Sequence, residues 1–238
     1  MSPLDVLILG NNSDTSTSCS GRSTDWMDDV TPTHGYISFD VTQKLKYGAF
    51  KSMREGRINL VGLVGPCPFP MVAGAPGPSV VLKQPYMDNP GTIDADSSSA
   101  IPTLSLSPDD QARELSADAL STQWADSLLR DVYDFISEYQ KQANTTCPVK
   151  IPSFRFVTTG LAMATLPSNK REIFLVEELI RGEEGPWRKY LNNNSSRPCQ
   201  FPDDDDENRQ RADFLAFAQH VQYWRTGCLA FTSDFQGK

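Results

Sequence analysis

The last residues of the chain carry oxygen-bearing side chains at a spacing suited to metal and phosphate chemistry. Asp234 and Gln236 stand two positions apart after the apolar run at residues 228–231, and Gly237 follows them. Side chains two apart at the end of a strand project to the same side. A carboxylate and an amide oxygen placed together suit Mg²⁺ and phosphate. The D-x-Q-G pattern alone is weak, because any strand that ends in a polar turn looks similar.

Lys83 and Gly48 are candidates for phosphate binding on two neighbouring predicted strands. Lys83 ends the apolar run at residues 80–82, where its ammonium group could hold phosphate oxygens as a point charge. Gly48 precedes Lys51 and would let a ligand approach the backbone closely. The alternative for Lys83 is a strand-end lysine in solvent, and one glycine in a strand is a weak signal. Neither residue belongs to a Walker loop or a G-x-G-x-x-G loop, since the sequence contains neither.

Residues 174–180 predict a hinge that could bind a nucleotide base. An apolar strand there runs into the acidic pair Glu177 and Glu178, which could bond a base through carboxylate and backbone groups. Lys189 and the asparagines at residues 192–194 then offer contacts to ribose and phosphate. The alternative is a strand followed by a polar loop.

The hydrophobic pattern predicts an α+β fold, a mostly antiparallel bent sheet with one or two helices packed against it. Apolar residues at three- and four-residue spacing predict helices at 123–142, with Ser121 or Thr122 as cap, and at 207–224. On the second helix one face is expected to hold the apolar side chains of Phe214, Leu215, Ala218, Val221 and Trp224. Short apolar or alternating runs predict strands at 36–41, 48–53, 57–64, 79–85, 154–164, 173–180 and from 228 onward.

Two stretches are poor in apolar residues and rich in Ser, Asp and Pro or Thr. They predict a disordered N-terminal segment over residues 1–34, clearest at 10–33, and a flexible insertion at 87–119. The ordered body is therefore expected to span residues 35–238 around that insertion.

The net charge and the cysteine and histidine content limit which partners, metal sites and cellular location are expected. The net charge is −8 and no basic stripe occurs, so nucleic acid is not an expected partner. Five scattered cysteines and two histidines, His34 and His220, offer no zinc spacing and no placed catalytic base. An odd cysteine count without a signal peptide or membrane segment predicts reduced thiols, a cytoplasmic location and no membrane partner.

Taken in chain order, these segments resemble the alpha-type protein kinases, an atypical Ser/Thr kinase family. The matching stretches are Gly-Ala-Phe-Lys at 48–51, Val-Val-Leu-Lys-Gln-Pro-Tyr at 80–86, residues 174–178 with 187–194, and residues 215–237. The last, which ends in D-x-Q-G, is the most specific. The resemblance covers residue 35 to the end, so it implies the first lobe of such a kinase and the start of the second.

The resemblance implies an ATP site. Lys83 resembles the lysine that holds the ATP phosphates, and Glu177 the hinge acid at the adenine, with Glu178 left open as the alternative. Lys189 and Asn193 resemble the nucleotide contacts after the hinge. Gly48 and Lys51 are the further cofactor-binding candidates. Lys83, Glu177 and Gln236 are then expected to converge on one cleft, with Gly48 beneath it.

The resemblance also implies catalytic and metal-binding roles for the D-x-Q-G segment. Asp234 resembles the catalytic aspartate and Gln236 the metal-ligating glutamine, so ATP and Mg²⁺ are the expected cofactors. The family usually has Arg where Lys51 stands, and lysine lacks the forked donors of arginine. Past D-x-Q-G the family continues into a second metal-binding aspartate, a Gly-rich loop and a His/Cys zinc module. The present sequence ends at Lys238. Zinc is therefore not expected here, and the 238-residue chain is not expected to turn over as a kinase.

Three functional hypotheses follow. The first is an ATP-dependent kinase, incomplete as given, that transfers the γ-phosphate to Ser/Thr of an unknown protein substrate. The second is an inactive nucleotide-binding or protein-interaction module, and the third is a fragment whose missing part lies elsewhere. A conventional protein kinase is excluded, because no H-R-D-x-x-x-x-N loop precedes the aspartate.

Overall fold

The computed structural model describes residues 2–7, 33–40, 42–48, 50–62, 67–71, 77–87, 104–165, 170–181, 186–195 and 197–237. The chain divides into two compact units. The first comprises Met1–Leu120 with Val157–Leu179, and the second comprises Ser121–Phe156 with Ile180–Lys238. Helix α1 (Pro108–Ala143) contributes its residues up to Leu120 to the first unit and the remainder to the second.

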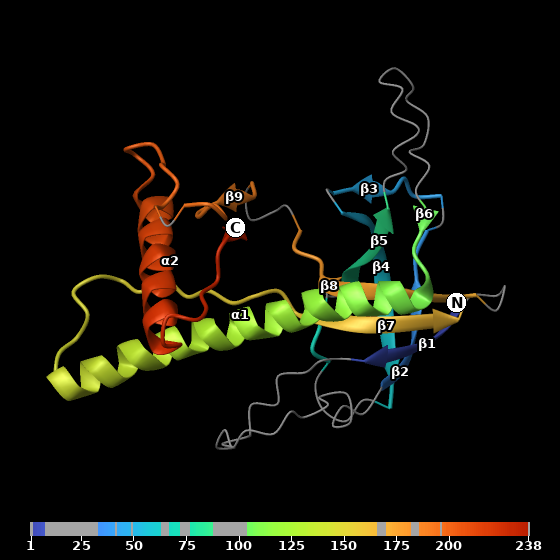
Figure 1. Ribbon diagram of the computed structural model, residues 1–238, viewed down its shortest axis with the longest axis horizontal. Coiled ribbons are helices and arrows are strands. Elements are labelled where there is room, and N and C mark those ends of the chain that lie inside the picture. The colour runs from blue at the N-terminus through green and yellow to red at the C-terminus, as the bar shows by residue number, and fades with distance from the viewer. Residues whose placement is uncertain are drawn as a thin grey trace. The chain divides into compact units, whose positions relative to one another are not determined.

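An antiparallel sheet forms the first unit (Figure 1). In the described residues its order is β3-β4-β2-β1-β7-β8-β5-β6, and β4 also pairs with β5, so six strands close into a ring. Together with the helices, this confirms the predicted α+β class. The strands are β1 (Ser2–Leu7), β2 (Thr33–Ser38), β3 (Lys46–Tyr47), β4 (Lys51–Val61), β5 (Ser79–Met87), β6 (Leu104–Ser105), β7 (Thr159–Thr165) and β8 (Arg171–Glu178).

The two faces of this sheet bury different clusters, because side chains alternate along each strand. On β5, Val80 and Leu82 belong to a core that also holds Phe174 and Val176 of β8. On the opposite face, Leu161, Ile173 and Leu175 pack against Leu115 and Ala119 of α1. Figure 1 shows the first turns of α1 beside β7 and β8. The face that carries Leu175 is therefore the face covered by α1.

Helix α1 begins at Pro108 rather than at Gln123, so the expected cap at residues 121–122 is wrong. Ser107 caps the helix instead: its Oγ accepts a hydrogen bond from Asp110 N at 3.2 Å and donates one to the Asp110 carboxylate at 2.7 Å. Proline at the first helical position suits this start, because its missing N–H would have no partner there. The expected flexible insertion is consequently wrong for residues 104–119, which form β6 and the first turns of α1, and residues 88–103 lie outside the described part of the chain.

The predicted disorder of residues 1–34 is wrong for residues 2–7 and 33–34, which lie in strands. Residues 2–7 form β1, which pairs with β2 on one side and β7 on the other, so they are not disordered. Residues 8–32 lie outside the described residues.

Two predicted strands, at 48–53 and 57–64, form the single strand β4, because its ladder with β5 runs unbroken from Lys51 to Arg57. Gly48 therefore does not lie within a strand but in the turn between β3 and β4, where Gly48 N donates to Lys51 O at 2.8 Å. The strands predicted at 154–164 and from 228 onward are shorter than expected, since 154–158 and 228–235 carry no strand.

The second unit contains the rest of α1, α2 (Asp206–Arg225), β9 (Arg188–Lys189) and β10 (Gln236–Gly237). Its core holds Val132 of α1, Tyr190, Leu191, Phe235 and the apolar face of α2. The predicted second helix is confirmed with nearly the expected ends, and Phe214, Leu215, Ala218 and Val221 are buried as expected. Trp224 is the exception, at 63% exposed, with its ring edge-on to Phe135.

Polar contacts fix both ends of α2. Asp205 caps the start, accepting from Asn208 N at 3.4 Å, and the Asn208 side chain donates to both carboxylate oxygens at 2.9 Å. These hydrogen bonds, chiefly that from the Asn208 side chain, hold the pKa of Asp205 below its usual value. At the other end Arg225 forms a forked contact with Asp131 of α1, the shortest distance being 2.8 Å.

No helix in the described part of the chain is long and apolar enough to cross a bilayer.

Gln111 completes the hydrogen bonding of β8 from α1. The pairing of β5 with β8 ends where Lys83 faces Leu175. Beyond that point, Ile173 N donates to Gln111 Oε1 at 3.0 Å, while Gln111 Nε2 donates to Leu106 O at 3.0 Å. The Gln111 side chain is buried, so its loss would remove the hydrogen-bond acceptor of Ile173 N.

We expect the Gln111→Met variant to lose about 1–3 kcal/mol of unfolding free energy, the range for an unsatisfied buried backbone group. Urea unfolding of the full chain measures it. Gln142→Met, an exposed glutamine on the same helix, is the matched control and should leave the midpoint unchanged. Equal midpoints for the two variants would contradict the assigned role of Gln111.

Candidate active-site residues

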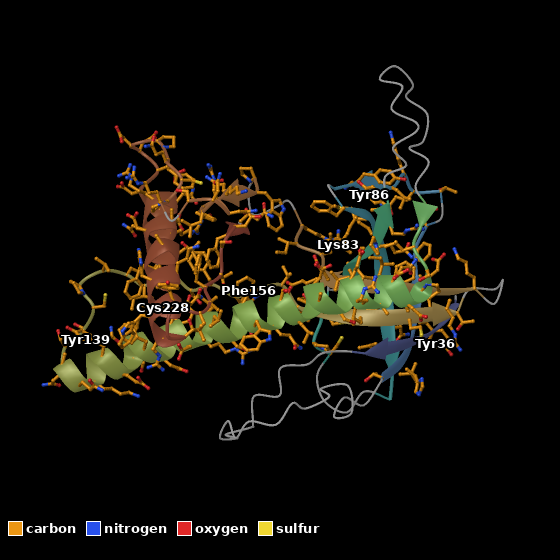
Figure 2. All side chains as sticks on the ribbon, viewed as in Figure 1. Tyr36, Lys83, Tyr86, Tyr139, Phe156 and Cys228 are labelled. Atoms are coloured by element: carbon orange, nitrogen blue, oxygen red, sulfur yellow. The ribbon has the colours of Figure 1, made fainter. Side chains whose placement is uncertain are left out.

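Lys83 lies on β5 (Figure 2), and it forms an ion pair with a residue of the neighbouring strand β8. Its Nζ is 2.6 Å from Oε2 of Glu177 on β8. Lys83 stands opposite Leu175, so Glu177, two positions further, is its diagonal neighbour on the same face. The side chains are 27% and 18% exposed, so the pair is partly buried and still open to solvent. The carboxylate of Glu177 therefore fixes the position of the Lys83 ammonium group, which remains accessible to solvent.

The neighbouring acid, Glu178, points to the other face of β8. It is buried, and its Oε2 accepts from Thr158 N at 3.3 Å. Glu177 and Glu178 are both candidates for the hinge acid, and because side chains alternate along a strand, they point to opposite faces of the sheet. Glu177 is the one that shares a face with Lys83, and its expected contact with adenine stays a prediction.

Lys51 opens β4 and forms an ion pair with α1. Its Nζ lies 2.6 Å from Oδ2 of Asp118. Lys51 is two residues from Met53, which stands opposite Lys83, so both lysines belong to the face that α1 covers. Asp118 is not among the predicted site residues, because its composition places it in the expected flexible insertion at residues 87–119. The available signal was the helix start Ser-Pro-Asp-Asp at 107–110, which has a capping serine, proline and acids in order.

Gly48 lies in the turn between β3 and β4, next to a tyrosine pair. The Tyr86 hydroxyl donates to Gly48 O at 2.6 Å, and the Tyr47 and Tyr86 rings meet edge to face at 5.5 Å. A Cβ added to Gly48 would lie 3.5 Å from Lys51 O, an ordinary contact. Space alone therefore does not require glycine here, and its expected closeness to a nucleotide stays a prediction.

In the second unit, Asp234 is held by two residues of the predicted nucleotide segment. Lys189 Nζ is 2.6 Å from Asp234 Oδ1. The Asn193 amide, oriented so that its nitrogen faces the acid, donates to the two carboxylate oxygens at 2.8 and 3.1 Å. Two of the predicted site residues, Lys189 and Asn193, thus meet at the carboxylate of a third, Asp234.

The backbone around Asp234 explains this placement. Asp234 has φ +59°, in the left-handed region that non-glycine residues seldom adopt. Immediately after it, Phe235 O accepts from Tyr190 N at 2.8 Å and from Leu191 N at 3.3 Å. Gln236 then pairs with Lys189 in the short β9–β10 ladder. The ladder brings the D-x-Q-G segment against the Lys189 segment.

The donor types at this end fit Mg²⁺ in part. Asp234 offers a carboxylate and Gln236, which is exposed, an amide oxygen. Within the described ranges, no three His, Cys, Asp or Glu side chains gather as a metal-binding group. Asp234 and Gln236 could thus supply two oxygen ligands, with water as the natural source of the others.

The predicted residues fall into two sets. Lys83, Glu177, Gly48 and Lys51 belong to the first unit, and Lys189, Asn193, Asp234 and Gln236 to the second. The expected convergence of Lys83, Glu177 and Gln236 on one cleft involves both units and stays a prediction.

Comparison with known protein families identifies the family of this chain. The model of the Alpha-kinase family matches residues 79–238, which is more than half of the chain and includes Lys83, Glu177 and the whole second set. No curated protein and no solved structure matches the chain.

Proposed function

Because this chain belongs to the alpha-kinase family, we propose that it binds ATP with Mg²⁺ and transfers the γ-phosphate to Ser/Thr hydroxyls of a protein. The kinase region in this proposal spans residues 35–238, and β1 with the start of β2 completes its sheet. The meeting of Lys189 and Asn193 with Asp234 is the observation that carries the proposal.

This observation supports catalysis for a chemical reason. Phosphoryl transfer depends mainly on positioning and on neutralising phosphate charge, and it needs a group that orients the attacking hydroxyl. A carboxylate that faces a lysine ammonium group provides both next to each other, an acceptor for the hydroxyl proton and a cation for phosphate oxygens. Asp234 is the acceptor and Lys189 the cation, while Asn193 fixes the orientation of the acid.

Lys83 is the second phosphate-binding residue in the proposal. Its ammonium group is partly open, and its present partner, Glu177, is a carboxylate that phosphate can replace. Replacement releases Glu177, which is then free to accept a hydrogen bond from the base. Gly48 and Lys51 complete the cofactor-binding set.

Gln236 and Asp234 would hold Mg²⁺, which when bound neutralises charge on the transferring phosphate. The chain itself would supply two oxygen ligands, the carboxylate of Asp234 and the side-chain amide of Gln236.

Titration calorimetry with Mg-ATP and a transfer assay on a generic Ser/Thr substrate test the proposal on folded 1–238. Micromolar or millimolar ATP binding that Lys83→Ala weakens would support the nucleotide site. Turnover that Asp234→Ala abolishes would establish the activity and overturn the expectation that these 238 residues alone are silent. Binding without turnover would favour the inactive nucleotide-binding module, and neither signal would favour a protein-interaction module.

A further inference from the structure

Two glutamines on the buried face of α2 bind the segment that leads to Asp234. Gln219 and Gln222 are 5% and 0% exposed. Gln219 Nε2 donates to Thr232 O at 2.7 Å, and Thr232 N donates to Gln222 Oε1 at 2.8 Å. Both backbone polar groups of Thr232 are thus satisfied by side chains, although residues 228–235 form no strand.

Burial of these amides has no explanation in the packing of α2. Leu215 and Ala218, which share the buried face with Gln219 and Gln222 at helical spacing, are apolar. Glutamine is mostly exposed in proteins, and a buried amide is costly unless it is hydrogen-bonded. Each of these side chains forms one hydrogen bond to the backbone of Thr232, through Gln219 Nε2 and Gln222 Oε1, while Gln222 Nε2 is buried without a partner in the described part of the chain.

The same segment is anchored on the far side of Asp234. Phe235 is buried, its ring lies 6.1 Å from that of Phe156, and its carbonyl accepts from Tyr190 N and Leu191 N. Asp234 therefore lies between two anchors, with only Ser233 separating it from Thr232. A left-handed aspartate persists only where the surroundings impose its backbone angles.

We propose that Gln219 and Gln222 are positioning residues for Asp234. By fixing Thr232 against α2, they hold Asp234 in the left-handed conformation and direct its carboxylate to Lys189. The value of this placement for phosphate transfer rests on the proposed function, whereas the placement itself can be measured without any activity.

The test compares Gln219→Met and Gln222→Met with Gln210→Met in the full chain. Methionine keeps the side-chain volume and removes the hydrogen bond, and Gln210 is an exposed glutamine on the same helix. Two signals are followed by NMR: the amide hydrogen exchange of Thr232, and the Cα and Cβ chemical shifts of Asp234, which report its φ. Signals of Ala212 and Val221 show that α2 remains folded.

We expect Gln222→Met, which removes the acceptor of the Thr232 N–H, to speed Thr232 exchange by at least about tenfold. Gln219→Met removes the donor to the Thr232 carbonyl, and both variants are expected to shift the Asp234 signals. Gln210→Met should change neither. A purely structural role would lower the melting temperature and leave the Asp234 shifts in place at lower temperature, which would overturn the proposal.

The unchanged protein gives a second measurement should a variant not fold. Its Thr232 amide should be protected from exchange, and exchange as fast as that of the exposed residues 203–204 would overturn the proposal. Failure of the proposed function would give a different result. In that case the Asp234 chemical shifts would still depend on both glutamines, but replacing Asp234 would change neither ATP binding nor phosphate transfer. The positioning role would then stand without a role in catalysis.

Discussion

Phosphate transfer from ATP is expected to fall by about 10²- to 10⁴-fold when Asp234 is replaced by asparagine, the range for loss of a positioned general base. Asparagine is the informative choice, because it tolerates the left-handed conformation of residue 234 and has nearly the same shape. The backbone should remain in place while the charge that faces Lys189 and Asn193 is lost. The initial rate of γ-phosphate transfer to a Ser/Thr peptide measures the effect, with 1–238 or any longer form that turns over.

Asp213→Asn is the matched control for this variant. Asp213 is an exposed acid on α2, so its replacement should leave the rate within about twofold. Equal rates for Asp234→Asn and Asp213→Asn would show that Asp234 has no part in transfer, however well Lys189 and Asn193 hold it.

The Lys83→Ala variant is expected to bind ATP about 1–3 kcal/mol more weakly, which corresponds to roughly 5- to 150-fold in Kd. The reason is the loss of a charge-assisted contact to phosphate at a partly buried position. Calorimetry at one fixed salt concentration measures the change, since screening alters charge contacts.

Two further variants serve as the control and as a test of the ion pair between Lys83 and Glu177. Lys170→Ala removes an exposed lysine just before β8 and should leave the Kd unchanged. Glu177→Gln removes the present counterion of Lys83. Tighter ATP binding by that variant would make Glu177 a competitor of phosphate, whereas weaker binding would support its contact with the base. An unchanged Kd for Lys83→Ala would contradict the phosphate-binding role.

Elements with local signals could be predicted from the sequence, and elements that depend on distant partners could not. The apolar spacing on α2 predicts its ends, since Phe214, Leu215, Ala218 and Val221 repeat at helical intervals. Residues 2–7 belong to a short apolar run that can form a strand, but nothing local shows its partners, since β1 pairs with β2 and with the distant residues 161–164 of β7. The start of α1 had a local signal at Ser107 and Pro108, but the polar composition around it favoured a loop.

In the candidate site too, some features have a local signal in the sequence and others depend on distant parts of the chain. The types and order of Lys83, Lys189, Asn193 and Asp234 could be read from the sequence, and so could their resemblance to a kinase. The conformation of Asp234 could not, since it depends on side chains of α2 that replace a strand partner. The ion pair of Lys51 with Asp118 was also beyond reach, because it needs the position of α1 on the sheet.

The place of β1 in the closed ring has a consequence for biosynthesis. Its first partner, β2, follows within the N-terminal part of the chain, but its second, β7, is formed by residues 159–165. At about 5–20 residues per second, a ribosome needs roughly 8–30 s to reach β7 after making β1. During that interval one edge of β1 is without its final neighbour, and an open edge is where strands of other chains add. A nascent chain of this protein therefore remains a substrate for chaperones until β7 has emerged.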